Sequence, residues 1–184
     1  MATTWSVLGL VVVATWAMLA YNRLVRLRNQ TRTAWADIDV QLQRRHDLVP
    51  RLVTVVQGYA AHERATLEAV TALRAQAQAV HGAARQGAVE ASLAQALVRL
   101  VALREAYPDL KANENFAQLS AALVEVEDHL QYARRFYNGA VRDYNDGRQR
   151  FPTLLVARGF GFAAAESFQT DDDSRAAPTV ELTP

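Results

Sequence analysis

Few residues in the chain are of the types that carry chemistry, and they are scattered. The four histidines, His46, His62, His81 and His129, lack the Glu-x-x-His spacing of di-iron sites in helical bundles, so we expect them at the surface or in loops. There is no cysteine, which excludes disulfides, zinc-thiolate sites and thiolate nucleophiles. Phosphate-loop, nucleophile-elbow and zinc-protease motifs are missing from the sequence as well. We therefore expect no catalytic residue, no metal site and no cofactor, in a protein that is not an enzyme.

Two Tyr-Asn dipeptides form a more specific pattern. Tyr137-Asn138 and Tyr144-Asn145 are one heptad apart and therefore share a face of a helix. An asparagine beside a buried seam usually fixes helix register through a satisfied side-chain hydrogen bond. This structural interpretation is favoured over the alternative, a binding role.

The element that must position these residues is a long helix. Its apolar residues recur at steps of three and four, which is the pattern of a packed helix seam. The seam consists of Phe116, Leu119, Leu123, Val126, Leu130, Ala133, Tyr137, Ala140 and Tyr144. The polar face between them carries Glu125, Glu127, Asp128, Gln131, Arg134, Arg135 and Arg142. Because one helix cannot bury its own seam, the rest of the chain must supply partner helices.

The N-terminal segment is uncharged and apolar from Trp5 to Tyr21. A membrane-spanning helix needs roughly 17 to 25 such residues, so we predict a single span at residues 5–21. The alternative, a cleaved signal peptide, is disfavoured because residues 1–4 carry no basic residue. Four arginines follow the span between positions 23 and 32. The positive-inside rule then places residues 1–4 outside and the body, residues 22–168, in the cytoplasm.

The first soluble helix is expected to continue from the span, with Asp37, Asp39, Arg44 and Arg45 on its solvent side. Pro50 interrupts the helical pattern, because proline removes a backbone donor and clashes with the preceding turn. We therefore predict a break near residue 47 and a second helix beyond it. The alternative is one kinked helix over residues 22–80.

In that second helix Gly58 suggests a close crossing of two backbones. A loop is predicted from His81 to Gly87, followed by a third helix over residues 89–107. Asn113 is the predicted N-cap of the long helix. The expected fold is all-α: an N-terminal transmembrane helix followed by an antiparallel four-helix bundle of long helices.

Two predictions concern the C-terminal part. The apolar run over residues 151–162 is expected to fold back over one end of the bundle. Alternatively, Phe160, Phe162 and Phe168 contact the lipid interface. Residues 169–184 are polar, acidic and proline-containing, so we predict a disordered tail.

Several sequence blocks resemble one protein family. These are YNRLVRLRNQTRTAWADIDVQLQRR at 21–45, DLVPRLVTVVQGYAAHE at 47–63, a block at 114–145 and FPTLLVARGFGF at 151–162. In that order they are similar to the LemA family of bacterial membrane-anchored proteins. The resemblance implies a single-pass protein of the bacterial inner (cell) membrane, with its N-terminus outside and a cytoplasmic four-helix bundle. It implies no catalytic residue. The chain departs from the family pattern near Glu166.

We interpret the chain as a non-enzymatic, membrane-tethered helical scaffold that recruits a partner protein or associates with itself. The alternatives are an envelope-stress or signalling component, and an enzyme if Asp37, Glu63 and Arg134 converge in a buried cleft. The formal charge of +1 argues against nucleic acid as a partner. The candidate structural and interaction residues are Trp35, Asp37, Asp39, Arg44, Arg45, Pro50, Tyr59, Glu63, Arg134, Tyr137, Asn138, Tyr144 and Asn145.

Overall fold

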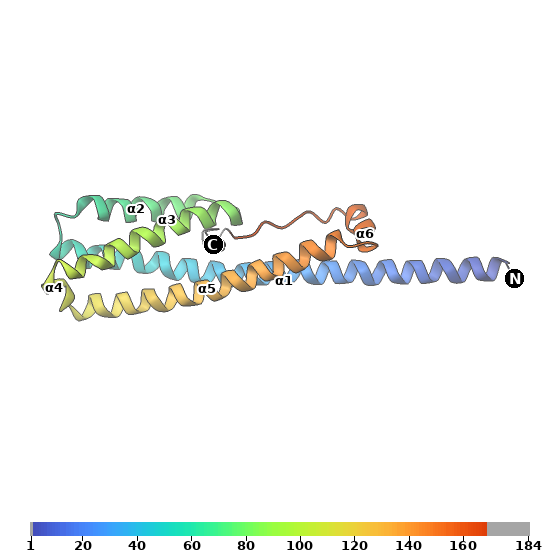
Figure 1. Cartoon of the computed structure of the whole chain (residues 1–184), viewed down its shortest axis with the longest axis horizontal. Helices are drawn as coiled ribbons and strands as arrows, with labels where there is room; N and C mark the ends of the chain where they lie inside the picture. Colours follow the sequence, from blue (N-terminus) through green and yellow to red (C-terminus); the bar gives the residue numbers. More distant parts are fainter. Residues whose placement is uncertain (1, 169–184) are drawn as a thin grey trace, which may run out of the picture. The chain divides into compact units, whose positions relative to one another are not determined.

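The computed structural model describes residues 2–168, and every regular element in that range is helical. The elements are α1 (Ala2–Tyr59), α2 (Arg64–Ala79), α3 (Ala83–Ala102), the 3-10 helix η1 (Leu103–Glu105), α4 (Pro108–Lys111), α5 (Glu114–Gln149) and α6 (Thr153–Gly159) (Figure 1). The predicted all-α class is confirmed, with a long apolar N-terminal helix packed against other long helices. The tail predicted at residues 169–184 lies outside the described residues.

The described chain divides into two compact units. The first unit comprises residues 2–47 and 122–167, which are most of α1, the C-terminal part of α5, and α6. The second unit comprises residues 48–121 and Phe168, which include α2 and α3. These two helices pack side by side (Figure 1). Their connection turns at Gly82, whose φ of 98° lies in the left-handed region that glycine adopts without a steric penalty.

In the first unit α1 and α5 run antiparallel. Arg45 of α1 pairs with Glu127 of α5, and the Trp35 ring lies 5.3 Å from the ring of Tyr137. The contact partner on α1 thus moves from residue 45 back to residue 35 as the contact on α5 moves from residue 127 forward to residue 137. The predicted α5 seam is confirmed, since all nine of its residues are buried or half-buried.

The predicted helix break near residue 47 is wrong, because α1 continues through Pro50 to Tyr59. A proline inside a helix costs about 3 kcal/mol. Against this cost, the neighbouring side chains of Val49, Leu52 and Val56 are no more than 1% exposed. Burying each of them contributes about 1.5–3 kcal/mol, which outweighs the proline penalty. Pro50 itself lies on the exposed side of the helix.

The chain reverses at residues 60–63 instead, so a single helix over residues 22–80 is also wrong. No glycine or proline lies in this turn, and side-chain hydrogen bonds of the second unit hold its two ends. Asn113 Nδ2 donates to the Tyr59 hydroxyl at 2.9 Å, and the Tyr107 hydroxyl donates to Glu63 Oε1 at 3.1 Å. The predicted N-cap is confirmed, because the Phe116 N–H donates to Asn113 Oδ1 at 2.8 Å.

Three smaller expectations also need correction. The loop predicted up to Gly87 ends earlier, since α3 begins at Ala83 and buries Gly87. Residues 153–159 fold back as predicted, but they do so as the short helix α6. A Cβ added at Gly58 would have nothing within 4 Å, so no backbone crosses there. The close contact lies at Gly147, where an added Cβ would be 2.9 Å from Leu27 Cδ1.

We expect Gly139→Ala to stabilise the protein by about 1 kcal/mol, because alanine has the higher helix propensity and an added Cβ meets nothing within 4 Å. Gly147→Ala is the matched comparison on the same helix. Its propensity gain should be largely offset, because the Leu27 side chain must move. Denaturant unfolding of the full-length protein in mild detergent, followed by circular dichroism, measures both. Equal stabilisation by the two changes would contradict the close α1–α5 contact at Gly147.

Candidate functional site

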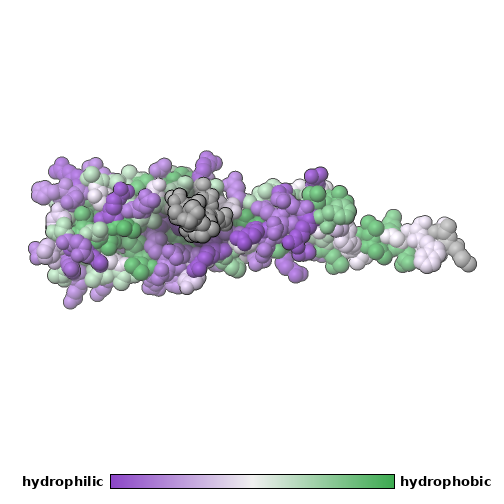
Figure 2. All heavy atoms as spheres, in the orientation of Figure 1, coloured by the Kyte–Doolittle hydropathy of each residue, from purple (hydrophilic) through white to green (hydrophobic). Residues whose placement is uncertain are grey.

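The N-terminal part of α1 exposes apolar side chains around its circumference. The following are each more than half exposed: Trp5, Val7, Leu8, Leu10, Val11, Val12, Val13, Met18 and Leu19. Figure 2 shows this apolar surface on the part of α1 that leads to the N-terminus. Among the described residues, α1 is the one helix long and apolar enough to cross a membrane by length and composition. It is therefore a candidate membrane span.

A second exposed apolar surface lies on α5. Val124, Tyr132 and Phe136, which we call the α5 outer stripe, are 60%, 66% and 52% exposed. Val124 precedes Tyr132 by eight residues and Phe136 follows it by four, so the three side chains lie within about one third of the helix circumference, beside the buried seam. The Arg135 guanidinium lies 4.6 Å from the centre of the Tyr132 ring. The stripe was not predicted from the sequence, because its three residues lie outside the apolar periodicity that defines the seam.

A buried ion pair joins the two long helices of the first unit. Arg45 Nη1 lies 2.7 Å from Glu127 Oε1, and the Arg45 side chain is fully buried while that of Glu127 is 31% exposed. Placing Arg45 on the solvent side was therefore wrong, and so was the surface position expected for His46, which is buried. The sequence held the signal, since Arg45 follows Leu42 by three residues and precedes Val49 by four, and both are buried seam residues.

Side chains of the two Tyr-Asn dipeptides form hydrogen bonds to an extended segment that follows α6. Residues 162–167, which we call the strap, follow α6 without regular secondary structure. The Tyr144 hydroxyl donates to the Ala163 carbonyl at 2.7 Å. Asn145 makes two hydrogen bonds to Ala165: its Nδ2 donates to the carbonyl at 2.9 Å, and its Oδ1 accepts from the N–H at 3.1 Å. The asparagine amide is thus satisfied, as the structural interpretation expected, and its partner is the strap backbone.

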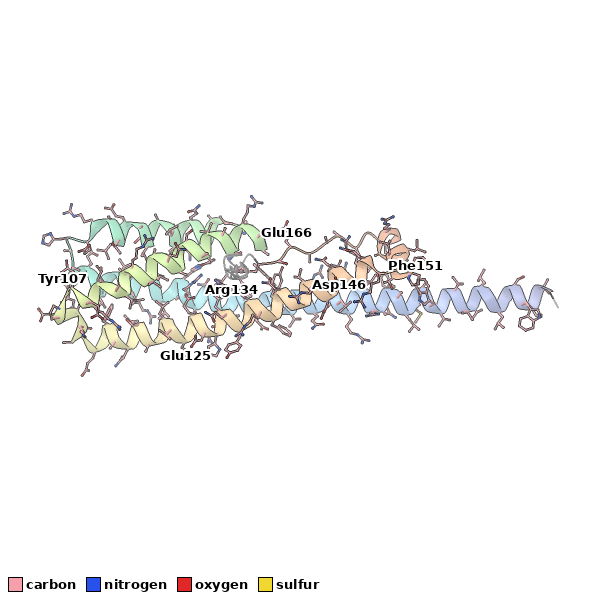
Figure 3. The ribbon with its side chains drawn as sticks, viewed as in Figure 1. Tyr107, Glu125, Arg134, Asp146, Phe151 and Glu166 are labelled. Atoms are coloured by element: carbon pink, nitrogen blue, oxygen red, sulfur yellow. The ribbon has the colours of Figure 1, made fainter. Side chains whose placement is uncertain are left out.

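Tyr137 provides a further contact to the strap. Its hydroxyl donates to the carbonyl of Glu166 at 2.7 Å, and Figure 3 shows Glu166 on the segment that follows α6. Burial of the phenol raises the pKa of Tyr137, and the nearby Glu166 charge adds to this shift. The hydroxyl therefore stays protonated at neutral pH and remains a hydrogen-bond donor.

The other predicted site residues have simpler surroundings. Asp37, Asp39, Arg44 and Pro50 are exposed, while Arg134 and Asn138 are half-buried. The Asp37 side chain, suggested for a buried cleft with Glu63 and Arg134, is exposed.

Glu63 and Tyr59 belong to the second unit, where each bonds across the chain reversal. The hydrogen bond to Glu63 raises the pKa of Tyr107, and burial and the Glu63 charge act in the same direction. Within residues 2–168, no three histidine or carboxylate side chains gather closely enough to hold a metal ion.

Comparison with known proteins gives two results. The family model described as LemA family matches residues 34–182. Among similar proteins, Magnetosome protein MamQ 2 and Magnetosome protein MamQ 1 of Paramagnetospirillum magneticum are each 26% identical to this chain, over 97% of it and 74% of the relative. Magnetosome protein MamQ of Magnetospirillum gryphiswaldense is 24% identical over the same shares. The similarity therefore extends over both the N-terminal apolar segment and the helical units.

We expect Glu127→Ala to destabilise the protein by about 3 kcal/mol, because the buried Arg45 guanidinium loses its carboxylate. Glu125→Ala is the matched control, because that side chain is 73% exposed and should change stability by less than about 0.5 kcal/mol. Denaturant unfolding of the full-length protein measures both changes, and equal costs for Glu127→Ala and Glu125→Ala would contradict a stabilising role of the pair.

We expect Asn145→Ala to open the strap, because two hydrogen bonds to Ala165 are lost. A loss of about 1–2 kcal/mol should speed local amide exchange of the strap roughly tenfold. Hydrogen exchange of the peptide covering residues 163–168 measures this effect. Asn115→Ala, at an exposed asparagine of the same helix, is the control. Unchanged protection in Asn145→Ala would show that these hydrogen bonds do not hold the strap.

The pH dependence of the strap follows from the raised pKa of Tyr137. A raised folded-state pKa means that folding favours the neutral phenol. The contribution of the phenol to stability is therefore complete below its usual pKa of about 10 and is lost as pH rises through the higher folded value. The stability difference between the unchanged protein and Tyr137→Phe should be constant at neutral pH and shrink only in strong alkali.

Proposed function

The chain belongs to the LemA family, and from this premise we propose that it is a membrane-anchored, non-enzymatic helical scaffold that recruits a partner protein. In this proposal residues 5–21 cross the inner (cell) membrane of a bacterium, and the body, residues 22–168, lies in the cytoplasm. The partner supplies an apolar helix face that packs along the α5 outer stripe.

The observation that carries this proposal is the exposure of that stripe. Tyr132 and Phe136 are large aromatic side chains left more than half exposed on a helix whose seam is buried. Aromatic residues are enriched in protein interfaces, where they bury a large area at a low cost in conformational entropy. Their positions along α5 suit a partner helix that packs beside it through an apolar face.

The charges around the candidate span support the proposed orientation. Arg23, Arg26, Arg28 and Arg32 follow the apolar segment within its next three turns, and no basic residue precedes it. Cytoplasmic flanks of membrane helices carry such an excess of arginine and lysine. The α5 outer stripe would then face cytoplasmic proteins.

The chemistry of the chain supports a role in binding rather than catalysis. The sequence carries no catalytic motif, and the Asp37 side chain, suggested for a cleft, is exposed. The near-neutral charge of +1 disfavours nucleic acid as the partner.

A signalling or envelope-stress role is the second candidate, and one observation favours it. Helix α1 runs without a break from the candidate span to Tyr59. A continuous helix can transmit a displacement of the span to the helices packed against it.

We expect a photoactivatable amino acid at position 132 or 136 to capture a partner in the native bacterial host, because both side chains are exposed on the stripe. The same residue at position 95, an exposed polar site on α3, is the control. Mass spectrometry of the adducts separates a different protein from a second copy of this chain. Adducts at 132 and 136 no different from those at 95 would contradict the proposal. Adduct yields that change under envelope stress would favour the signalling role over a constant scaffold.

A further inference from the structure

A third exposed apolar surface surrounds α6. Phe151, Leu155 and Phe160 are 80%, 61% and 67% exposed. Figure 3 shows Phe151 at the turn between α5 and α6, and Figure 2 shows apolar surface over the position of α6. Three large apolar side chains within ten residues are costly to leave in water, at roughly 1.5–3 kcal/mol each. We call this surface the α6 face. Covering it with an apolar partner would be energetically favourable.

The inner side of α6 fixes its position on α1. Val156 and Ala157 are buried in a cluster with Ala20 and Leu24 of α1. The cluster lies where the uncharged segment of α1 ends. The α6 face is consequently held beside the C-terminal end of the candidate membrane span.

An aromatic contact gives the same position independently. The Phe160 ring lies 4.9 Å from the ring of Tyr21, in an edge-to-face arrangement. Tyr21 is the last residue of the predicted span, and tyrosines at the ends of spans sit at the level of the lipid headgroups. Phe160 therefore lies at the depth where the bilayer changes from apolar to polar.

Charged side chains lie one turn further along α1, on the side away from the candidate span. Arg23, Asp143, Asp146 and Arg150 line a shallow depression between α1 and α5. Arg158 adds an exposed positive charge on α6 itself. Arg150 pairs with Asp146 at 4.0 Å, whereas Arg23 and Arg158 are the basic side chains that suit the headgroup region, where arginine binds lipid phosphates.

The predicted span is also short for a bilayer. Residues 5–21 rise by about 1.5 Å each, giving about 26 Å against a hydrocarbon core of about 30 Å. A short span is tolerated more easily when neighbouring apolar groups extend its surface toward the headgroups. The α6 face lies where that extension is needed.

We propose that α6 is a second membrane contact, with Leu155 and Phe160 inserted into the lipid interface beside the end of the span. This inference rests on the proposed span at residues 5–21 and adds to it a peripheral contact that the scaffold role does not require. The structure corrects part of the alternative drawn from the sequence, which placed all three phenylalanines at the lipid interface. Phe160 faces outward, whereas Phe162 and Phe168 are buried and are not available to lipid.

The test uses nitroxide spin labels on the full-length protein in vesicles of phosphatidylethanolamine and phosphatidylglycerol. Because the chain has no cysteine, Leu155→Cys and Phe160→Cys each give a single labelling site. Val11→Cys, 52% exposed in the candidate span, is the lipid reference. Val98→Cys, 70% exposed on α3, is the water reference. Collision rates with oxygen, which concentrates in lipid, and with a water-soluble nickel complex report the depth of each label.

We expect the oxygen-to-nickel ratio at positions 155 and 160 to shift from the value at 98 toward that at 11. A ratio at either position equal to that at 98, while position 11 remains lipid-exposed, would overturn the membrane contact of α6 and leave the span intact. A water-like ratio at position 11 would instead overturn the span, and with it this inference.

Discussion

Burial of the apolar seam along α5 is the constraint on which the rest of the first unit depends. A helix of this length gains little stability from its backbone hydrogen bonds in water, so its seam must be covered by another helix. The antiparallel part of α1 that follows the candidate span supplies that cover in the first unit, with Trp35 against Tyr137 and Leu27 against Gly147. This register also brings Tyr144 to the cluster that α6 and the strap complete.

Helix α1, which covers this seam, also buries a charge, and the charge makes the register specific. Arg45 occupies a fully buried position that periodicity would assign to an apolar residue, and it is matched by Glu127. Taking an arginine out of water costs several kcal/mol unless a carboxylate compensates. A slip of α1 along α5 by one turn would keep apolar groups covered but separate this pair. The ion pair therefore selects one register among several that hydrophobic burial alone would allow.

Features with a local physical cause could be predicted from the sequence, whereas features that depend on tertiary contacts could not. The α5 seam and the Asn113 cap follow from residue spacing within a few turns, and both are confirmed. The break at Pro50 was wrong because a proline penalty is local, whereas the burial that overrides it comes from other helices. The partner of Asn145 could not be predicted either, since the strap lies about twenty residues away and has no periodicity of its own.

Besides the N-terminal part of α1, the α5 outer stripe and the α6 face expose apolar side chains, and their positions along α1 suit different partners. The α6 face touches Tyr21, at the end of the proposed span. The α5 stripe flanks Tyr137 and Glu127, which contact Trp35 and Arg45 of α1. Those residues lie about 21 Å and 36 Å beyond Tyr21 along the helix, from the rise of about 1.5 Å per residue. With residues 5–21 as the proposed span, lipid would cover the α6 face and would not reach the stripe, which is consistent with the protein partner proposed for it.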